Sequence, residues 1–164
     1  MDFKRLMAKR TKGLSPSPIR KLVPLMRQPG MVSLGGGYPS AKTFAFEAME
    51  VVFKSGRRFS IRDGAMDLAC QYGPTDAHAE LKPHLLAWHK AKDGVELTPE
   101  QVQVLTGAQE GLHIMGYLFL DTGDAVALSE PAYPGALGAF RAFTENFIPV
   151  PIDAEGMKTA DLEA

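Results

Sequence analysis

A glycine-broken turn between two regular segments is the feature of this sequence best suited to bind an anion. Residues 102–106 form a run rich in β-branched side chains, Gly107 interrupts the run, and residues 109–120 carry the apolar spacing of a helix. A helix that begins directly after such a turn presents unpaired N–H groups and the positive end of its dipole. We therefore expect Ala108 and Gln109 to offer their backbone amides to a phosphate group. The alternative is an ordinary loop between a strand and a helix that binds nothing.

A tyrosine between two prolines is the second feature that could contact a ligand. Residues 125–128 are predicted to form a buried strand, and Glu130-Pro131-Ala132-Tyr133-Pro134 follows it. The carboxyl ends of strands form the ligand crevice in open α/β sheets, so Tyr133 could present its ring face to a planar molecule there. The alternative is a tyrosine packed on its own loop.

Several other chemistries are not supported by the sequence. No Gly-x-x-x-x-Gly-Lys-Ser/Thr phosphate loop occurs, and Gly35-Gly36-Gly37 lacks the third glycine and the directly following helix of a dinucleotide fingerprint. The four histidines do not have the i, i+4 spacing of a helical metal pair, so no metal site is expected. Cys70 has no nucleophile signature around it and is interpreted as a small apolar filler.

The composition is that of a soluble globular protein, with 45% hydrophobic and 23% charged residues and a formal net charge of -1. No apolar run approaches the roughly 18–20 residues of a membrane span, so no membrane association is expected. The single cysteine suits a reducing compartment. Residues 1–27 hold eight lysines and arginines against one acid. A solvated basic arm is favoured, although a mitochondrial presequence or a nucleic-acid contact would also fit.

The apolar spacing predicts an α/β fold. Strands are expected over 102–106, 125–128 and 147–150, with helices over 109–120 and 134–143 between them. That alternation implies parallel β-α-β units. The earlier part of the chain is expected to be helical, over residues 3–10, 18–27, 44–55, 66–70 and 76–92.

Four short motifs, taken in order, resemble the class I/II (fold-type I) pyridoxal-phosphate-dependent aminotransferases. They are Gly36-Gly37-Tyr38-Pro39, Gln71-Tyr72-Gly73-Pro74, Gly107-Ala108-Gln109 and Glu130-Pro131-Ala132-Tyr133. Residues 15–20, Ser-Pro-Ser-Pro-Ile-Arg, are similar to the kynurenine/2-aminoadipate aminotransferase branch. The resemblance covers essentially the whole chain. It implies three parts: an N-terminal arm and substrate-entry segment (1–40), a helical segment bridging a small and a large domain (41–97), and the start of the large α/β domain with its mixed or parallel sheet (98–164).

The resemblance also implies which residues hold pyridoxal 5'-phosphate. Ala108 and Gln109 match residues that bind the cofactor phosphate, and Tyr133 matches the aromatic residue that stacks on the pyridine ring. Tyr72 matches a tyrosine that reaches the phosphate of the neighbouring subunit's cofactor, which implies a homodimer. Family members commonly carry a hydroxyl residue at the position of Ala108, so one phosphate hydrogen bond is expected to be missing.

Three further residues match substrate-binding positions of the family. Gly36 lies where a missing side chain leaves room for substrate, and Tyr38 belongs to the same motif. Arg20 matches a mobile arm residue whose guanidinium can pair with a substrate carboxylate.

The Schiff-base lysine of the family is not found. None of the ten lysines lies in a Ser-x-x-Lys context, so the chain is interpreted as an N-terminal fragment that is inactive alone. The parent enzyme is expected to take part in amino acid metabolism, moving an amino group from an aromatic amino acid, kynurenine or 2-aminoadipate to a 2-oxo acid. The alternatives are another fold-type I enzyme, such as a lyase or synthase, or a non-catalytic half-fold that binds a partner protein. A cytoplasmic location is favoured, a mitochondrial one is left open, and no nucleic-acid partner is expected.

Overall fold

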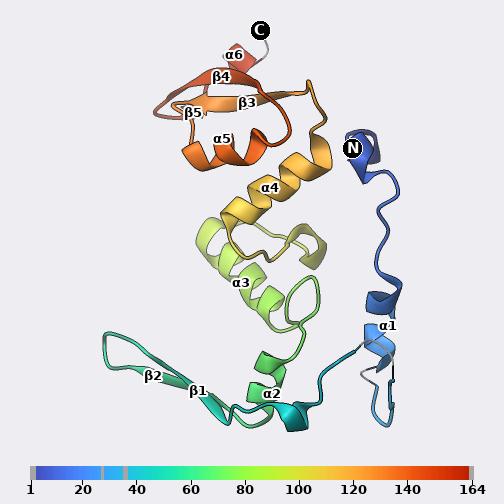
Figure 1. Cartoon of the computed structure of the whole chain (residues 1–164). Helices are drawn as coiled ribbons and strands as arrows, with labels where there is room; N and C mark the ends of the chain where they lie inside the picture. Colours follow the sequence, from blue (N-terminus) through green and yellow to red (C-terminus); the bar gives the residue numbers. More distant parts are fainter. Residues whose placement is uncertain (1–2, 27, 35–36, 163–164) are drawn as a thin grey trace. The chain divides into compact units, whose positions relative to one another are not determined.

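The computed structural model describes residues 3–26, 28–34 and 37–162, except for the side chains of Ile19, Arg20 and Pro24. The chain divides into two compact units (Figure 1). The first combines residues 1–15 with residues 105–164, and the second comprises residues 16–104.

A parallel β-α-β element lies at the centre of the first unit. Strand β3 (Ala125–Glu130) leads through helix α5 (Pro134–Phe140) to strand β4 (Asn146–Asp153), and the two strands pair in parallel. A short strand, β5 (Gly156–Met157), adds to β4 in the antiparallel direction. Helix α5 lies along one face of this sheet (Figure 1), and the buried apolar residues there are Ala136, Ala139 and Val150. The α/β class and this parallel pair are confirmed, whereas β5 was not expected.

Helix α4 (Ala108–Phe119) precedes the sheet and packs against α5. It forms because Leu112, Met115, Leu118 and Phe119 recur at helical spacing after the glycine turn. The last helix of the chain is α6 (Thr159–Leu162).

The N-terminal segment packs on the end of α4. The Ala8 amide donates a 2.7 Å hydrogen bond to the Leu118 carbonyl oxygen. The Arg10 guanidinium lies 5.0 Å from the centre of the Phe143 ring, within the range of a cation–π contact. Ala8 and Thr11 are buried. Most described residues of this basic arm are exposed, as expected of a solvated arm, but apolar and aromatic contacts hold its middle against α4.

The predicted helix over 3–10 is also replaced by two shorter elements. They are the 3-10 turns η1 (Phe3–Arg5) and η2 (Lys9–Thr11), with residues 6–8 between them. The chain departs from helical geometry at Ala8, whose amide bonds to α4 instead of to its own preceding turn. A tertiary contact thus overrides the local helical preference.

Three helices confirm expected positions in the second unit. They are α1 (Pro18–Met26), α2 (Gly64–Cys70) and α3 (Leu81–Asp93), and a 3-10 turn, η4 (Pro99–Gln101), follows them. Helix α3 begins five residues later than the expected 76, since Pro83 is tolerated only in the first turn of a helix. A further 3-10 turn, η3, covers Ala41–Thr43.

A β-hairpin occupies the stretch 44–55 where a helix was predicted. Strand β1 (Ala48–Val52) pairs antiparallel with β2 (Arg58–Arg62), and Gly56 in the connection has a φ of 82°. The apolar residues Met49, Val51 and Phe53 alternate along the chain, whereas Phe46, Met49, Val52 and Phe53 fit a helical spacing. The hairpin forms because this stretch contains β-branched residues and a glycine turn and has a partner strand with which to pair.

The predicted strand over 102–106 is likewise wrong. These residues have no regular secondary structure, although Val102 and Val104 are partly buried. A strand requires a hydrogen-bonded neighbour, and the described residues place no strand beside this run.

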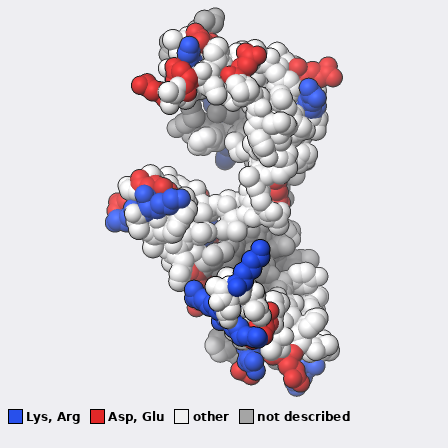
Figure 2. Space-filling model, turned by 90° about the vertical axis from the view of Figure 1, so that its left-hand side faces the viewer, with Lys and Arg blue, Asp and Glu red and all other residues white. Residues whose placement is uncertain are grey.

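The described surface exposes many large apolar side chains. Val32 and Leu34 are 84% and 99% exposed, and Phe46 and Leu68 are each more than 60% exposed. Most of the face drawn in Figure 2 is uncharged, with positive and negative side chains close together on it. No helix among the described residues is long and apolar enough to span a bilayer.

Candidate functional site

The turn that precedes α4 has the backbone geometry expected for an anion site. Gly107 adopts φ 136° and ψ 165°, a conformation that residues with a Cβ rarely adopt. Helix α4 begins at the next residue, Ala108, so the first amides of the helix follow the turn at once. The amides of the first helical turn have no acceptor within the helix and carry the positive end of its dipole. Ala108 and Gln109 therefore lie where a phosphate could accept their N–H groups.

The side chain of Glu110 spans this turn and bonds to Thr106, the residue before Gly107. Its Oε2 accepts a 2.6 Å hydrogen bond from the Thr106 amide and a 2.7 Å hydrogen bond from the Thr106 hydroxyl. The hydroxyl, and after it the amide, hold the pKa of the Glu110 carboxyl below its usual value. Glu110 is thus an ionised carboxylate at neutral pH. Sequence analysis missed this residue, although its position four residues after a threonine and early in a predicted helix was a usable signal.

Gln109 and Tyr133 meet at Gly135. The Gln109 side-chain amide donates a 2.8 Å hydrogen bond from Nε2 to the Gly135 carbonyl oxygen. A Cβ on Gly135 would lie 2.6 Å from Tyr133 Cζ and 2.7 Å from Gln109 Oε1. The phosphate-turn residue and the aromatic residue predicted to stack on the cofactor therefore both lie against Gly135. Gly135 was not identified from the sequence.

The loop that carries Tyr133 leads directly from β3 into α5. The Glu130–Pro131 peptide bond is cis, and the Ser129 hydroxyl donates a 3.2 Å hydrogen bond to the Pro131 carbonyl oxygen. Tyr133 is the residue before the helix, and Pro134 takes the first helical position, where its missing N–H costs nothing. The Tyr133 side chain is 64% exposed. Its ring is accessible to a planar ligand and is not buried in its own loop.

These residues fit a phosphorylated aromatic cofactor. The turn supplies amide donors for an anionic group, the Gln109 side chain supplies a further polar group, and Tyr133 supplies an accessible ring within the same unit. Ala108 contributes no hydroxyl to the set. This donor set could hold a phosphate through neutral hydrogen-bond donors and a heterocycle through stacking.

In the second unit, Tyr38 and Tyr72 form an aromatic pair. Their ring centroids are 5.8 Å apart with an interplanar angle of 80°, an edge-to-face contact. Gln71 joins the two motifs, because its Nε2 donates to the Pro39 carbonyl oxygen at 2.9 Å while its Oε1 accepts from the Tyr72 amide at 3.0 Å. Two motifs that lie more than thirty residues apart in the sequence are thus held together.

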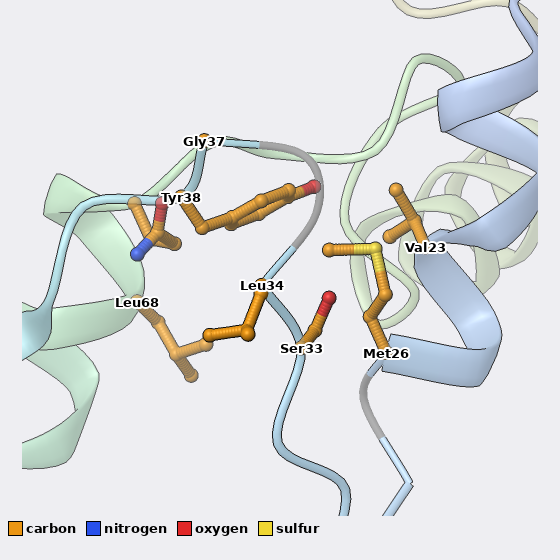
Figure 3. Close-up of a pocket in the computed structure, with 8 residues that line it drawn as sticks. Val23, Met26, Ser33, Leu34, Gly37, Tyr38 and Leu68 are labelled. Carbon is orange, nitrogen blue, oxygen red and sulfur yellow. The ribbon is translucent and has the colours of Figure 1, made fainter.

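Tyr38 also lines a largely apolar cavity of about 520 Å³ (Figure 3). The Tyr38 ring extends across it toward the side chains that α1 contributes, and Leu34 approaches Leu68 on the other side. The full lining comprises Val23, Met26, Ser33, Leu34, Gly37, Tyr38, Leu68 and Gln71. Of these lining residues, only Tyr38 was predicted to bind substrate, while Gly37 and Gln71 belong to two of the family motifs. The apolar lining residues of α1 and α2 were not singled out, because an apolar residue gives no sign of whether it faces a core or a ligand cavity.

Two of the predicted substrate residues are only partly accounted for. Arg20 lies in α1, the helix that supplies Val23 and Met26 to the cavity, but its side chain is not described. Gly36 lies outside the described residues. The described residues contain no cluster of three or more potential metal ligands.

Residues 31–164 match the family described as aminotransferase class I and II, and the chain belongs to that family. It is 28% identical over 163 residues to aromatic-amino-acid aminotransferase 1 from Thermococcus litoralis, an alignment that covers 99% of this chain and 38% of the relative. It is 34% identical to 2-aminoadipate transaminase from Thermus thermophilus, covering 92% of this chain and 34% of the relative. The resemblance to this family is confirmed.

Solved structures agree with this assignment. The aminotransferase Aro8 from Candida albicans superimposes with a TM-score of 0.81 over 99% of this chain and 39% of that chain, at 22% identity, which supports the fold. The kynurenine aminotransferase from Pyrococcus horikoshii, solved with PMP and kynurenine, gives a TM-score of 0.56 at 31% identity, with the same two coverages. The chain spans about two fifths of the length of these relatives.

Proposed function

We propose that this chain forms the phosphate turn and the ring-stacking wall of a pyridoxal-phosphate-dependent aminotransferase. The observation that carries the proposal is the convergence of Gln109 and Tyr133 on Gly135, directly beside the amide donors at the start of α4. Membership of the family and the solved relatives support the same reading.

The chain's own residues would bind and orient the cofactor. The Ala108 and Gln109 amides would hold the phosphate, and Tyr133 would lie against one face of the ring and fix its plane. Tyr72 would reach the cofactor phosphate of a second subunit, which makes a homodimer part of the proposal. Pyridoxal phosphate itself supplies an electron sink for the bonds to the substrate α-carbon.

Within the second unit, the cavity beside Tyr38 would suit the side chain of an amino-acid substrate. Its apolar lining by Leu34, Leu68 and Met26 favours an aromatic or long aliphatic group. Arg20 in the neighbouring helix would pair with a second carboxylate where the substrate has one, as 2-aminoadipate does. The proposed reaction therefore moves the amino group of an aromatic amino acid, kynurenine or 2-aminoadipate to a 2-oxo acid.

None of the ten lysines in the chain is in a Ser-x-x-Lys context, so we propose that none of them holds the cofactor covalently. We therefore propose that the chain binds the cofactor weakly and does not catalyse transamination by itself. A lyase or synthase built on the same fold would share every feature described above. Assaying the protein that also contains the lysine with a panel of amino acids would separate these reactions.

Cofactor binding is best tested with pyridoxine 5'-phosphate, which lacks the aldehyde and so cannot react with surface lysines. The 164-residue chain would be titrated with pyridoxine 5'-phosphate and with pyridoxine, and binding would be followed by tyrosine fluorescence and equilibrium dialysis. We expect a clear preference for the phosphorylated ligand. Tyr133→Ala should weaken that binding by roughly tenfold, the size of one lost stacking contact. Gln109→Ala should also weaken it by roughly tenfold, because it removes the hydrogen bond to the Gly135 carbonyl that holds the first turn of α4 beside Tyr133. Equal affinity for the two ligands would contradict the proposal.

A further inference from the structure

The side chain of Glu110 bridges the turn before α4 in an unusual way. Its Oε2 accepts from both donors of Thr106, at 2.6 and 2.7 Å, and Gly107, Ala108 and Gln109 lie between the two partners. The contact therefore closes a ring around the residues that carry the proposed phosphate donors. An ordinary capping box would instead use the residue directly before the helix, which here is a glycine with no side chain.

Besides the Glu110 contact and the Gln109 hydrogen bond to Gly135, little on the turn itself fixes its conformation. Gly107 at φ 136° has the widest conformational freedom of any residue type, and a Cβ there would meet no heavy atom within 4 Å. Ala108 offers no side-chain hydrogen bond. The turn must nevertheless hold the Ala108 and Gln109 amides in place if they are to bind an anion without an ordering cost.

We propose that Glu110 is a positioning residue. It holds the phosphate turn in its binding geometry by accepting hydrogen bonds from both the amide and the hydroxyl of Thr106. This inference rests on the proposed function, because it assigns a role within the same site. Glu110 does not itself contact the phosphate. Its negative charge lies at the favourable N-terminal end of α4, where it stabilises the helix that presents the donors.

The carboxylate has two properties that can be separated experimentally. Its oxygens accept the two Thr106 hydrogen bonds, whereas its charge opposes a dianionic ligand. Glu110→Gln keeps an oxygen that can accept from the Thr106 amide and removes the charge. Glu110→Ala removes both. If Glu110 positions the turn, Glu110→Gln should keep the preference for pyridoxine 5'-phosphate over pyridoxine, and Glu110→Ala should lose it.

The experiment measures the ratio of the affinities for pyridoxine 5'-phosphate and pyridoxine in the full 164-residue chain. We expect Glu110→Ala to lower this ratio by roughly three- to tenfold, with Glu110→Gln within about twofold of the original chain. Thr106→Val should also lower the ratio, while Thr106→Ser should preserve it. The double variant Glu110→Ala/Thr106→Val should lose little more than either single change, because both remove one shared contact.

A purely structural role would change the unfolding midpoint without altering the affinity ratio of the folded chain. An unchanged ratio in Glu110→Ala, or additive losses in the double variant, would overturn the positioning role and leave the cofactor site standing. If the original chain itself shows no preference for the phosphorylated ligand, the proposed function and the positioning role both fail. Exchange protection of the Thr106 amide, which Glu110→Ala should abolish, reports on the contact directly.

Discussion

Gln109 donates a 2.8 Å hydrogen bond to the carbonyl oxygen of Gly135 and so joins the first turn of α4 to the first turn of α5. In the sequence, α4 precedes β3 and α5 follows it. Their N-terminal turns are nevertheless joined by this hydrogen bond. In the proposed function, that contact would let two motifs separated by more than twenty residues act on one ligand.

Replacing Gly135 by alanine should damage the candidate cofactor site. The added Cβ would lie 2.6 Å from Tyr133 Cζ and 2.7 Å from Gln109 Oε1, which is closer than atoms can pack, so both side chains must move. We expect the affinity for pyridoxine 5'-phosphate to fall by roughly tenfold or more, measured by equilibrium dialysis.

Gly138 provides the matched control in the same helix. A Cβ at Gly138 would meet no heavy atom within 4 Å, so Gly138→Ala should leave ligand affinity unchanged. It should also stabilise α5 by about 0.5–1 kcal/mol, since alanine favours a helix interior over glycine. Equal ligand losses in the two variants would show that Gly135 has no special relation to Tyr133 and Gln109.

Serine at position 108 should strengthen phosphate binding. Ala108 is the first residue of α4, and a hydroxyl there would add one hydrogen bond to a charged acceptor beside the existing amides. We expect Ala108→Ser to raise the affinity for pyridoxine 5'-phosphate by roughly three- to tenfold and to leave that for pyridoxine unchanged. A gain for both ligands alike would mean that the serine acts on the stability of the turn and not on the phosphate.

Much of the candidate site could be predicted because its residues form local motifs. The glycine turn before α4 and the tyrosine before α5 are read from neighbouring residues, and both elements begin within a residue or two of the predicted positions. Gly135 could not be identified in the same way. Its importance comes from two side chains that approach it from different helices, and only the folded chain brings them together.

Two of the wrong secondary-structure predictions, over 44–55 and 102–106, have different causes. Residues 44–55 satisfy helical and alternating spacing at once, and the pairing of β1 with β2 decides between them. Residues 102–106 have the composition of a strand, but the sheet of the first unit consists of β3, β4 and β5 without them. Strand formation depends on a partner elsewhere in the chain, which local composition does not specify.

Glu100 should contribute to the pH dependence of stability. Its own backbone amide, and after it the Thr98 hydroxyl, hold the pKa of the Glu100 carboxyl below its ordinary value of 4.5. A depressed folded-state pKa means that this stabilisation is fully present above the unfolded-state pKa and is lost as the pH falls through the folded-state value. Glu100→Gln should therefore reduce the loss of stability below about pH 4.5 in urea unfolding, without changing the slope between pH 6 and 8. If the free energy of unfolding falls equally below about pH 4.5 in the original chain and in Glu100→Gln, this assignment is contradicted.

The isolated chain should be only marginally stable and prone to associate. Val32, Leu34, Phe46 and Leu68 are all more than 60% exposed, and the buried apolar residues are few and mostly small. Exposed apolar patches of this kind favour association, so we expect dye binding to apolar surface and concentration-dependent light scattering. Leu34→Ser should lower both signals, because Leu34 is 99% exposed and contributes little to a core. A sharp cooperative melt of a monomer would refute the expectation.

Ala77 carries backbone strain that glycine should relieve. Its φ of 87° lies in the region that a Cβ disfavours, and it follows Asp76, whose carboxylate pairs with Lys82 at 3.3 Å. The strain costs more than the extra unfolded-state freedom that glycine brings, so Ala77→Gly should raise the free energy of unfolding by about 0.5–1 kcal/mol. Ala79, two residues later, is not among the described non-glycine residues with positive φ, and Ala79→Gly should lower stability by about 0.4–1 kcal/mol. The urea unfolding midpoints of the two variants, measured at low protein concentration, should therefore move in opposite directions. A shift of both midpoints to lower urea concentration would show that residue 77 does not adopt this conformation in solution.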